Sequence, residues 1–398
     1  MKILLLGEYS GVHSNLAKGL RALGHTVTVA SNGDFWKNYP RDIDLQRSLS
    51  PRGTIGFLFR LSKALPRMKG FDIVQLINPM FLELKAERLF PIYKYLRKNN
   101  RHIVLCAMGM DYYWVNTCVT AKPLRYSDFN IGDELRTNAD AMAERAAWIG
   151  TEKERLNKLI AHDCDHIVTG LYEYYVCYKP VFEGKTTFIP LPIDIGEWGK
   201  KGTGQTEACD NYGIKPQDSD KQQAIDTPDM KHKEKPRKIK IFIGINVARS
   251  EYKGTDIMLR AAHDVACRHP DAIELIVARS VPFSQYSQMM NSSDVILDQL
   301  YSYTPAMNAL LAMSKGIVCV GGGEPESYDI LNEHSLHPII NVQPTYESVY
   351  SCLEQIALHP ESIPALQNQS VEYVRRHHDH IKVARQYEQV YKRLLSSR

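Results

Sequence analysis

The sequence predicts an α/β protein with two Rossmann-like domains, each a doubly wound parallel sheet, that face one cleft. Three observations predict this class. Short apolar runs alternate with amphipathic helical patterns, which is typical of a parallel sheet covered by helices. The 398 residues suit two domains of ~150–200 residues each. A polar segment near the middle of the chain separates two such alternating regions.

The first predicted domain, residues 1–196, opens with a buried strand at 3–6 and the glycine turn GEYSG. A helical pattern of leucines follows and ends at Gly24. This order of strand, glycine turn and helix is how a doubly wound sheet begins. Further strands are predicted at residues 25–31, 72–77, 102–106 and 166–169, and the segment 185–195 is expected to close this half with a strand and a proline-rich exit.

The second predicted domain, residues 239–372, repeats the alternation after a different kind of segment. Residues 197–238 are rich in glycine, proline, lysine, aspartate and glutamine, so they predict a loop or mobile linker. Strands are then predicted at 239–245, 273–278, 295–299, 317–322 and 338–342, with helices at 253–269, 284–293 and 309–316. The last segment, 373–398, is expected to form a helix that packs back on the first domain.

The composition excludes several function classes. A net charge of +4 gives no sign of the strong basic stripe of a nucleic-acid binder, so no nucleic-acid partner is expected. The run ILLL near the start is too short for a secretion signal, and no stretch of ~20 apolar residues could span a membrane. Eight cysteines without a CxxC pair favour a reducing, cytoplasmic location.

The second half of the sequence carries the motifs GINVARSEYKGTDIMLRAA, SSDVILDQLY and AMSKGIVCVGG, in this order. They resemble the basic loop, the donor-site strand and the following helix and strand of the GT-B fold glycosyltransferases, in particular the retaining family 4 type ("glycosyl transferases group 1"). The N-terminal GEYSGVHSNLAKGLRALGHTVTVAS resembles its first glycine loop. The resemblance covers nearly the whole chain except 197–238.

The resemblance implies a nucleotide diphosphate-sugar donor held by the second domain and an acceptor held by the first. It implies no cofactor besides the donor substrate and no catalytic metal, because positive side chains and helix ends stabilise the leaving diphosphate.

Arg249 and Lys253 are the first candidate catalytic residues. They lie in the ARSEYKG loop that follows a buried strand. An arginine and a lysine together can neutralise the charge that grows on a diphosphate as its bond breaks. The alternative is two solvated charges on a loop.

The loop SYTPAMNALLAM is a candidate phosphate site. Thr304 suits a helix N-cap and Pro305 the first helical position. The amides of Ala306 and Met307 would then be free to bind an anion.

Two glutamates that the family places around this loop are missing. The matching positions hold Tyr303 and Leu311. The first family glutamate contacts the donor sugar, and a tyrosine could still hydrogen-bond a sugar hydroxyl. The second contacts the ribose, and Asn308, one turn earlier on the same helix face, is expected to reach the ribose instead of Leu311.

Three nearby acids could replace the missing glutamates. Asp298 ends a predicted strand, and Glu324 and Glu326 follow the glycine run at 321–323, where backbone can approach a phosphate closely. Glu326 is the first choice as donor contact and Asp298 the second. The alternative is that Asp298 caps a turn and both glutamates are solvated.

The first domain offers Gly11 and Asp111. Gly11 allows a close backbone approach to a ligand. Asp111 follows a strand among aromatic residues, and its carboxylate could orient an acceptor hydroxyl or assist its deprotonation. The alternatives are an ordinary helix start for the glycine and a turn cap for the aspartate, with Trp114 in the core.

Two histidine clusters and one basic segment complete the candidates. The clusters, at 162–166 and 377–380, lack the spacing of a zinc site, so no metal is expected. Residues 51–70 carry five basic and no acidic residues, with leucines and phenylalanine at helical spacing. They fit a peripheral contact with an anionic membrane, or an ordinary packed helix with a solvated basic edge.

Together these features predict a cytoplasmic, metal-independent, retaining glycosyltransferase. The inner face of the membrane is the alternative location. The enzyme would transfer a sugar to a glycan or lipid-linked hydroxyl in polysaccharide or glycolipid synthesis. The alternatives are a catalytically silent sugar-nucleotide or glycan-binding protein and a nucleotide-sugar epimerase.

Overall fold

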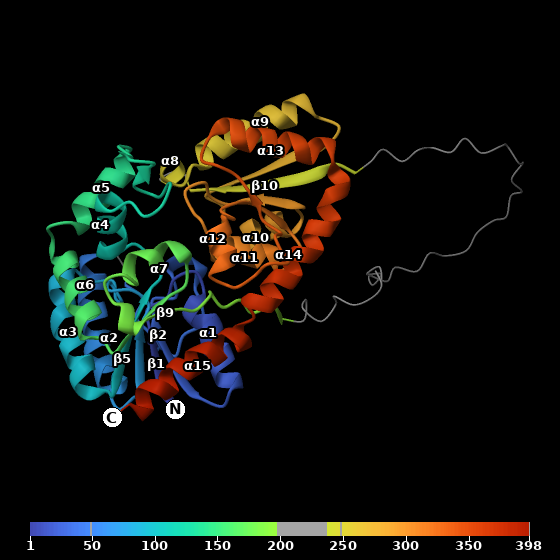
Figure 1. Cartoon of the computed structure of the whole chain (residues 1–398). Coiled ribbons are helices and arrows are strands. Elements are labelled where there is room, and N and C mark those ends of the chain that lie inside the picture. The colour runs from blue at the N-terminus through green and yellow to red at the C-terminus, as the bar shows by residue number, and fades with distance from the viewer. Residues whose placement is uncertain (48–49, 197–236, 247–248, 398) are drawn as a thin grey trace, which may run out of the picture.

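The computed structural model describes residues 1–47, 50–196, 237–246 and 249–397. They form two α/β halves, each with its own sheet (Figure 1). The predicted linker, 197–238, lies outside the described residues except for its last two.

The first half is built on a parallel sheet in the order β3-β2-β1-β4-β5-β8-β9. Its strands are β1 (Lys2–Leu6), β2 (Thr26–Ser31), β3 (Ile43–Asp44), β4 (Ile73–Leu76), β5 (His102–Ala107), β8 (His166–Thr169) and β9 (Thr186–Phe188). Its helices are α1 (Val12–Ala22), α2 (Pro51–Ala64), α3 (Ala86–Asn99), α4 (Tyr112–Thr120), α5 (Ala139–Trp148), α6 (Glu152–Asp163) and α7 (Tyr172–Tyr178). The central strands are almost wholly buried because helices cover both faces of the sheet.

The second half is built on a parallel sheet in the order β11-β10-β12-β13-β14. Its strands are β10 (Ile239–Ile245), β11 (Ile273–Arg279), β12 (Val295–Leu297), β13 (Val318–Gly321) and β14 (Ile340–Asn341). Its helices are α8 (Ser250–Lys253), α9 (Thr255–Arg268), α10 (Phe283–Asn291), α11 (Met307–Met313), α12 (Pro325–Asp329), α13 (Tyr346–Leu358) and α14 (Ile363–His377). The α/β class with two Rossmann-like domains is thereby confirmed.

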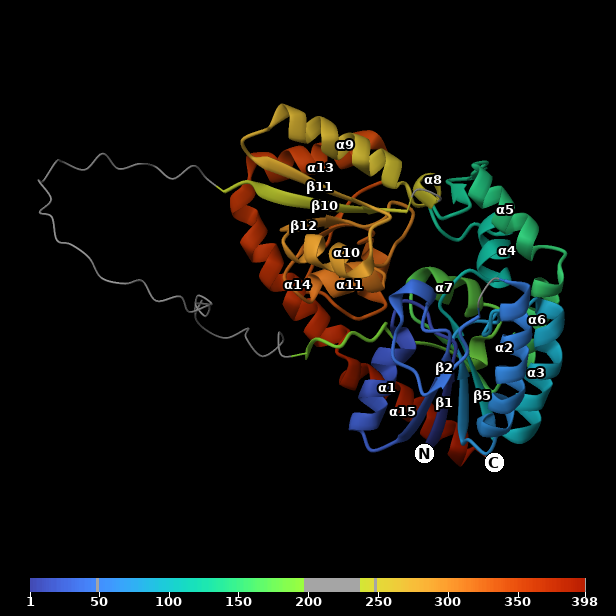
Figure 2. The same cartoon turned by 180° about the vertical axis from the view of Figure 1, so that it is seen from behind.

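The last helix, α15 (His380–Ser396), returns to the first half and lies along α1 (Figures 1 and 2). Gly19 of α1 makes this approach close, since a Cβ there would lie 2.2 Å from the His380 carbonyl oxygen. Tyr387 and Tyr391 of α15 are fully buried against the sheet. The two halves are therefore joined by the C-terminal helix as well as by the chain between them.

Two local predictions differ from the structure. The helix predicted to start at Thr304 and Pro305 begins at Met307, with Ala306 as its N-cap. A short antiparallel hairpin, β6 (Asn130–Ile131) and β7 (Glu134–Leu135), was not foreseen, because two-residue strands leave no periodic signal.

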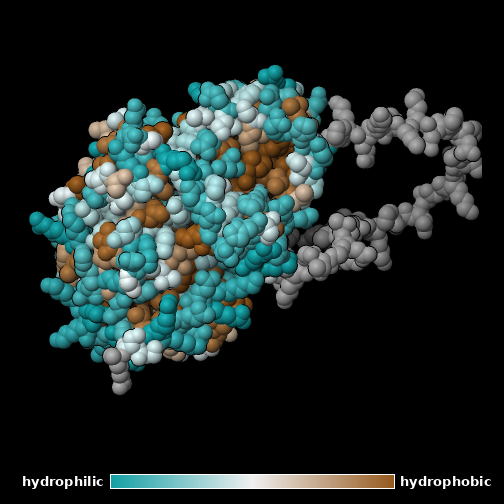
Figure 3. All heavy atoms as spheres, in the orientation of Figure 1, coloured by the Kyte–Doolittle hydropathy of each residue, from teal (hydrophilic) through white to brown (hydrophobic). Residues whose placement is uncertain are grey.

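No described helix is both long and apolar enough to cross a bilayer. The face in Figure 3 is mostly hydrophilic, and its largest hydrophobic patch lies on the second half.

Candidate functional site

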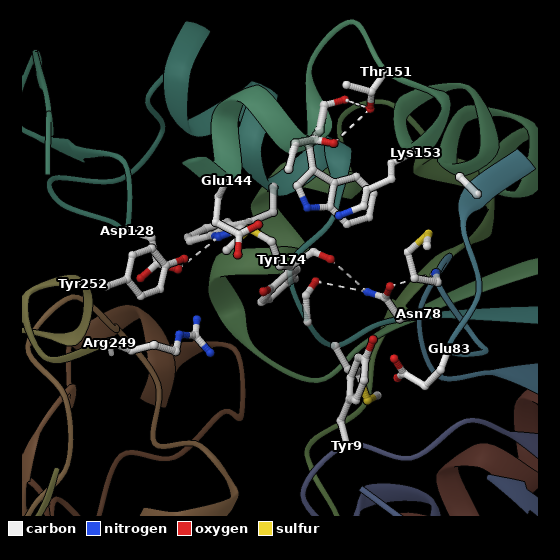
Figure 4. A pocket seen from close by; sticks show the side chains of 18 of the residues that line it. Tyr9, Asn78, Glu83, Asp128, Glu144, Thr151, Lys153, Tyr174, Arg249 and Tyr252 are labelled. Carbon is white, nitrogen blue, oxygen red and sulfur yellow. Dashed lines mark hydrogen bonds between the residues drawn. The ribbon is translucent and has the colours of Figure 1, made fainter. Parts of the chain in front are cut away.

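A cavity of about 1010 Å³ lies between the two halves. Loops at the carboxyl ends of the first sheet line one side of it, and the residues around α8 and the loop after β12 line the other. A crevice at the carboxyl ends of parallel strands is where open α/β sheets bind ligands. Figure 4 shows ten of its side chains by name.

The second half contributes two cations, Arg249 and Lys253, at the two ends of the short helix α8. The helix follows strand β10 and ends at Lys253, and its C-cap Gly254 has a φ of 71° that suits glycine. Burial lowers the pKa of Lys253; nearby Asp298 opposes this shift and Arg249 adds to it. The cavity therefore has a positively charged wall, and a bound anion would neutralise its charges.

The first half faces this wall with acids and aromatic rings. Glu144 of α5 and Arg249 point into the cavity from opposite sides, with Tyr174 between them (Figure 4). The Trp114 indole N–H donates to Asp128 over 3.3 Å. Burial raises the pKa of Asp128, while Arg136 and Arg249 oppose this shift. Carboxylates beside aromatic faces are the groups that bind sugar hydroxyls and sugar rings.

The far end of the cavity is lined by Tyr9, Asn78 and Glu83 (Figure 4). Asn78 is fixed by donating to the carbonyl oxygens of Gly109 and Met110 over 3.3 and 3.2 Å. Burial raises the pKa of Glu83 although Arg47 opposes it. This end is polar and lies wholly within the first half.

The predicted phosphate loop is already occupied by the protein's own carboxylate. Glu173 of α7 accepts from the backbone N–H groups of Tyr303 and Thr304 over 2.6 and 3.0 Å. It also accepts from the hydroxyls of Ser302 and Thr304, each over 2.7 Å. Thr304 therefore does not cap α11, and the prediction that it does is wrong. Ala306 and Met307 lie beyond this contact, and their role as an anion site stays a prediction.

Tyr303 is buried between the halves and does not line the cavity. Its ring packs near those of Tyr126 and Tyr172, and its hydroxyl oxygen accepts from the backbone N–H of Arg125 over 2.7 Å. A contact between this hydroxyl and a donor sugar would require the halves to separate locally.

The two candidate glutamates are paired across the same interface. Arg125 donates to Glu326 over 2.6 Å and to Glu324 over 2.7 Å. Tyr126 and Gln343 also donate to Glu324, and these bonds with Arg125 lower its pKa despite burial. The alternative that both glutamates are solvated is wrong for Glu324, whose side chain is 4% exposed. The donor contact proposed for Glu326 remains a prediction.

The glycine run after β13 packs against another loop of the chain. A Cβ on Gly322 would lie 2.1 Å from the Ser302 carbonyl oxygen, so the glycine lets this loop and the 302–304 loop touch. Where the sequence suggested a close approach to a phosphate, the structure shows a close approach to backbone.

Asp298 and Asn308 form a polar chain behind the cationic wall. Asn308 donates to Asp298 over 3.2 Å and accepts from the Tyr286 hydroxyl over 3.0 Å. Burial raises the pKa of Asp298 and the charge of Lys253 opposes it. Asp298 and Lys253 therefore each favour the charged form of the other, whereas Leu311 is half-buried and apolar.

Asp111 and Gly11 also lie outside the cavity lining. Asp111 caps α4 by accepting from the Trp114 N–H over 2.9 Å, and it accepts from the Tyr178 hydroxyl over 2.8 Å. Burial raises its pKa to about 7. The structure thus gives Asp111 the capping role that was its alternative. Gly11, at φ 88°, makes its close approach to the Tyr39 ring and not to an open site.

The histidine clusters do not gather into a metal site: no group of three or more potential ligands lies together among the described residues. Of the predicted site residues, the structure brings Arg249 and Lys253 into the cavity. Four further residues that line the cavity were not predicted from the sequence: Asp128, Glu144, Glu173 and Tyr174. These residues follow no sequence spacing that is typical of a site, and the position of Glu144 is typical of the solvated face of an amphipathic helix.

No family model matches the chain, and no curated protein matches it. Solved structures do. Sucrose-phosphate synthase from Thermosynechococcus elongatus superposes with a TM-score of 0.58 at 11% identity, covering 100% of both chains. The chain has the GT-B fold.

Two further structures share the GT-B fold. HepE from Anabaena, solved with UDP and glucose, has a TM-score of 0.55 at 12% identity over 100% of both chains. The UDP-GlcNAc 2-epimerase from Neisseria meningitidis, solved with UDP-GlcNAc, has a TM-score of 0.53 at 11% identity over 99% and 100%. The resemblance of the sequence to GT-B proteins is thus confirmed for the fold.

Proposed function

We propose that the protein is a glycosyltransferase that moves a sugar from a nucleotide diphosphate-sugar to a hydroxyl of a glycan or lipid-linked acceptor. The observation that carries the proposal is the pair Arg249 and Lys253, which face a cavity between two Rossmann-like halves. The GT-B structures solved with UDP and glucose or with UDP-GlcNAc support a donor of this chemical class.

In the proposed reaction the acceptor hydroxyl attacks the anomeric carbon of the donor. A new C–O bond forms there, the bond to the diphosphate oxygen breaks, and its electron pair leaves with the diphosphate. The acceptor proton passes to the leaving diphosphate or to solvent. Arg249 and Lys253 stabilise the charge that grows on the leaving group, which is the task that a metal ion performs elsewhere.

The proposal places the sugar between the cationic wall and the side chains of Asp128, Glu144 and Tyr174. Retention of configuration and independence from metal follow the family 4 resemblance. We also propose a cytoplasmic location, which the free thiols of all described cysteines support. Polysaccharide or glycolipid synthesis is the proposed context.

The test is an assay for nucleoside diphosphate released from a panel of UDP-, GDP- and ADP-sugars with glycan acceptors. We expect Arg249→Ala and Lys253→Ala to lower kcat by about ten- to hundred-fold, because each loses a charged contact of about 1.5–3 kcal/mol that strengthens in the transition state. Arg279→Ala, an exposed arginine outside the cavity, is the control. Equal kcat in the parent and both cavity variants would refute the assignment, and NMR of the product's anomeric proton tests retention.

A nucleotide-sugar epimerase is the second candidate, favoured by the shared fold with the epimerase from Neisseria meningitidis. The same assay separates the two functions. An epimerase converts the donor sugar without any acceptor, whereas a transferase consumes the donor in proportion to glycosylated acceptor.

A further inference from the structure

Helix α2 exposes an apolar stripe on its outer face. Ile55, Leu58 and Phe59, at helical spacing i, i+3 and i+4, are 71%, 40% and 60% exposed. The opposite face of the same helix is buried in the core of the first half through Phe57 and Leu61. The helix therefore does not need the outer residues for packing, and no other described helix exposes three large hydrophobic side chains.

Positive charge surrounds this stripe. Arg60, Lys63, Arg67 and Lys69 are exposed on α2 and the turn after it, and the Lys63 ammonium lies 4.2 Å from the centre of the Phe59 ring. Residues 51–101, which span α2, β4 and α3, hold eleven lysines and arginines against three acids, a net charge of +8. The whole chain carries +4, so the remaining residues carry −4. The net positive charge of the protein is thus concentrated in this part of the sequence.

The stripe begins at the rim of the cavity. Arg47, which lines the cavity, donates to the Glu83 carbonyl oxygen over 2.8 Å and to the Thr54 hydroxyl over 3.1 Å. Thr54 lies in the first turn of α2, next to Ile55. Helices α2 and α3 lie side by side on the outer edge of the first half (Figures 1 and 2), and the Tyr95 hydroxyl of α3 donates to the Leu65 carbonyl oxygen at the end of α2.

We propose that α2 docks the protein on an anionic phospholipid bilayer, with Ile55, Leu58 and Phe59 entering the headgroup region and the surrounding cations binding lipid phosphates. Apolar side chains flanked by lysine and arginine are what an interfacial helix presents to such a surface. A soluble polyanion would satisfy the charges but leave the apolar stripe in water. The docked helix would set the cavity rim beside the bilayer, so the acceptor is a lipid-linked hydroxyl; this last step rests on the proposed function.

The experiment is flotation of the full chain with vesicles of phosphatidylcholine, with and without phosphatidylglycerol. We expect binding to the anionic vesicles only, and a weakening of at least about ten-fold when Ile55, Leu58 and Phe59 are all changed to Ser. The matched control changes Met142, Val181 and Leu358 to Ser; these are 54%, 53% and 52% exposed but lie elsewhere. The control should float like the parent, and both variants should keep the parent's melting temperature because the side chains are exposed.

A second variant, Lys63→Gln with Arg67→Gln, should bind more weakly and with a smaller dependence on salt. Absence of parent flotation, equal binding to neutral vesicles, or an unaffected Ile55/Leu58/Phe59 variant would overturn the proposal. Binding of heparin that survives the apolar variant, without flotation, would show a polyanion surface instead. Flotation requires no catalysis, so docking without any glycosyl transfer would refute the proposed function and leave the membrane contact standing.

Discussion

At the scale of single residues, burial decides which charged groups can act. Lys253 lies between a cation and an acid: Arg249 disfavours its charge and Asp298 supports it. Asp298 in turn depends on Lys253 and Asn308. Such a set holds a positive charge in place for an anionic ligand without leaving it uncompensated when the ligand is absent.

Asp111 provides a pH test at this scale. Its folded pKa of about 7 lies above the unfolded value of 3.8, so the folded state binds the proton more tightly. Its contribution to stability is complete below pH 3.8 and is lost as the pH rises through 7, by up to about 1.4 kcal/mol per pH unit. Asp111→Asn cannot titrate, so the free energy of unfolding of the variant, measured against the parent, should improve from pH 5 to pH 8. A difference between the two proteins that stays constant with pH would contradict the assignment.

At the scale of elements, the segment after α4 and the start of α7 hold the second half in place. Arg136, in the hairpin segment, donates to the carbonyl oxygens of Glu251 and Tyr252 and lies 3.5 Å from the Tyr301 ring centre. Arg125 binds the loop at α12, and Glu173 binds the loop before α11. These polar contacts join the halves beside an apolar cluster that contains Ile77 of the first half and Met307 of the second.

Glu173→Gln tests the contact to the 302–304 loop. The carboxylate accepts four hydrogen bonds here, three at Oε1 and one, from the Thr304 hydroxyl, at Oε2. An amide keeps one acceptor oxygen and turns its NH2 group toward the donor at the other position. We expect the free energy of unfolding to fall by about 2–4 kcal/mol, because buried donors lose their acceptor. Denaturant unfolding measures it, with the exposed Glu183→Gln on the same segment as the control. A loss no larger than that of the control would show that the loop is held by other contacts.

Arg125→Ala tests the other side of the interface. The variant removes the charged partner of the buried Glu324, although Tyr126 and Gln343 still donate to it. We expect the free energy of unfolding to fall by about 1–3 kcal/mol and the radius of gyration in X-ray scattering to increase. Arg268→Ala removes an exposed arginine that pairs with Glu354 within the second half, and it should change neither quantity measurably. An unchanged scattering profile for Arg125→Ala would mean that this contact does not hold the halves together.

The sequence predicted the sheets better than the site. Strands such as β1, β5, β10 and β13 were located within one or two residues, because parallel strands covered on both faces are continuous apolar runs. Arg249 and Lys253 were found because they follow a strand in a recognisable loop. Glu173 was missed because its partners are about 130 residues away, and no local pattern records a contact across a domain interface. Thr304 has a residue type that favours the N-cap position, but it is bound by Glu173 and does not cap α11.

At the scale of the whole molecule, the chain crosses between the halves again near its end. The backbone of Ile193 pairs with residues 378 and 380, and α15 then covers α1 and the sheet of the first half. The relative position of the halves, and so the width of the cleft, depends on this return.

Gly19→Ala tests the return of α15. Alanine favours an isolated helix over glycine by about 0.8–1 kcal/mol, but a Cβ at this position would meet the His380 carbonyl oxygen at 2.2 Å. We therefore expect a net loss of about 1–3 kcal/mol in the free energy of unfolding. Gly184→Ala, where a Cβ would meet nothing within 4 Å, should change it little. A stabilised Gly19→Ala variant would mean that α15 is free to shift away.

Calorimetric titration of nucleotide sugars into the full chain tests the central claim most directly, that a nucleotide diphosphate-sugar binds in the cleft against Arg249 and Lys253. We expect at least one UDP-, GDP- or ADP-sugar to bind the parent, and Arg249→Ala and Lys253→Ala each to bind it about ten-fold or more weakly. Arg279→Ala should bind it like the parent. Binding of no member of the panel, or equal affinity in the parent and both cavity variants, would contradict the account.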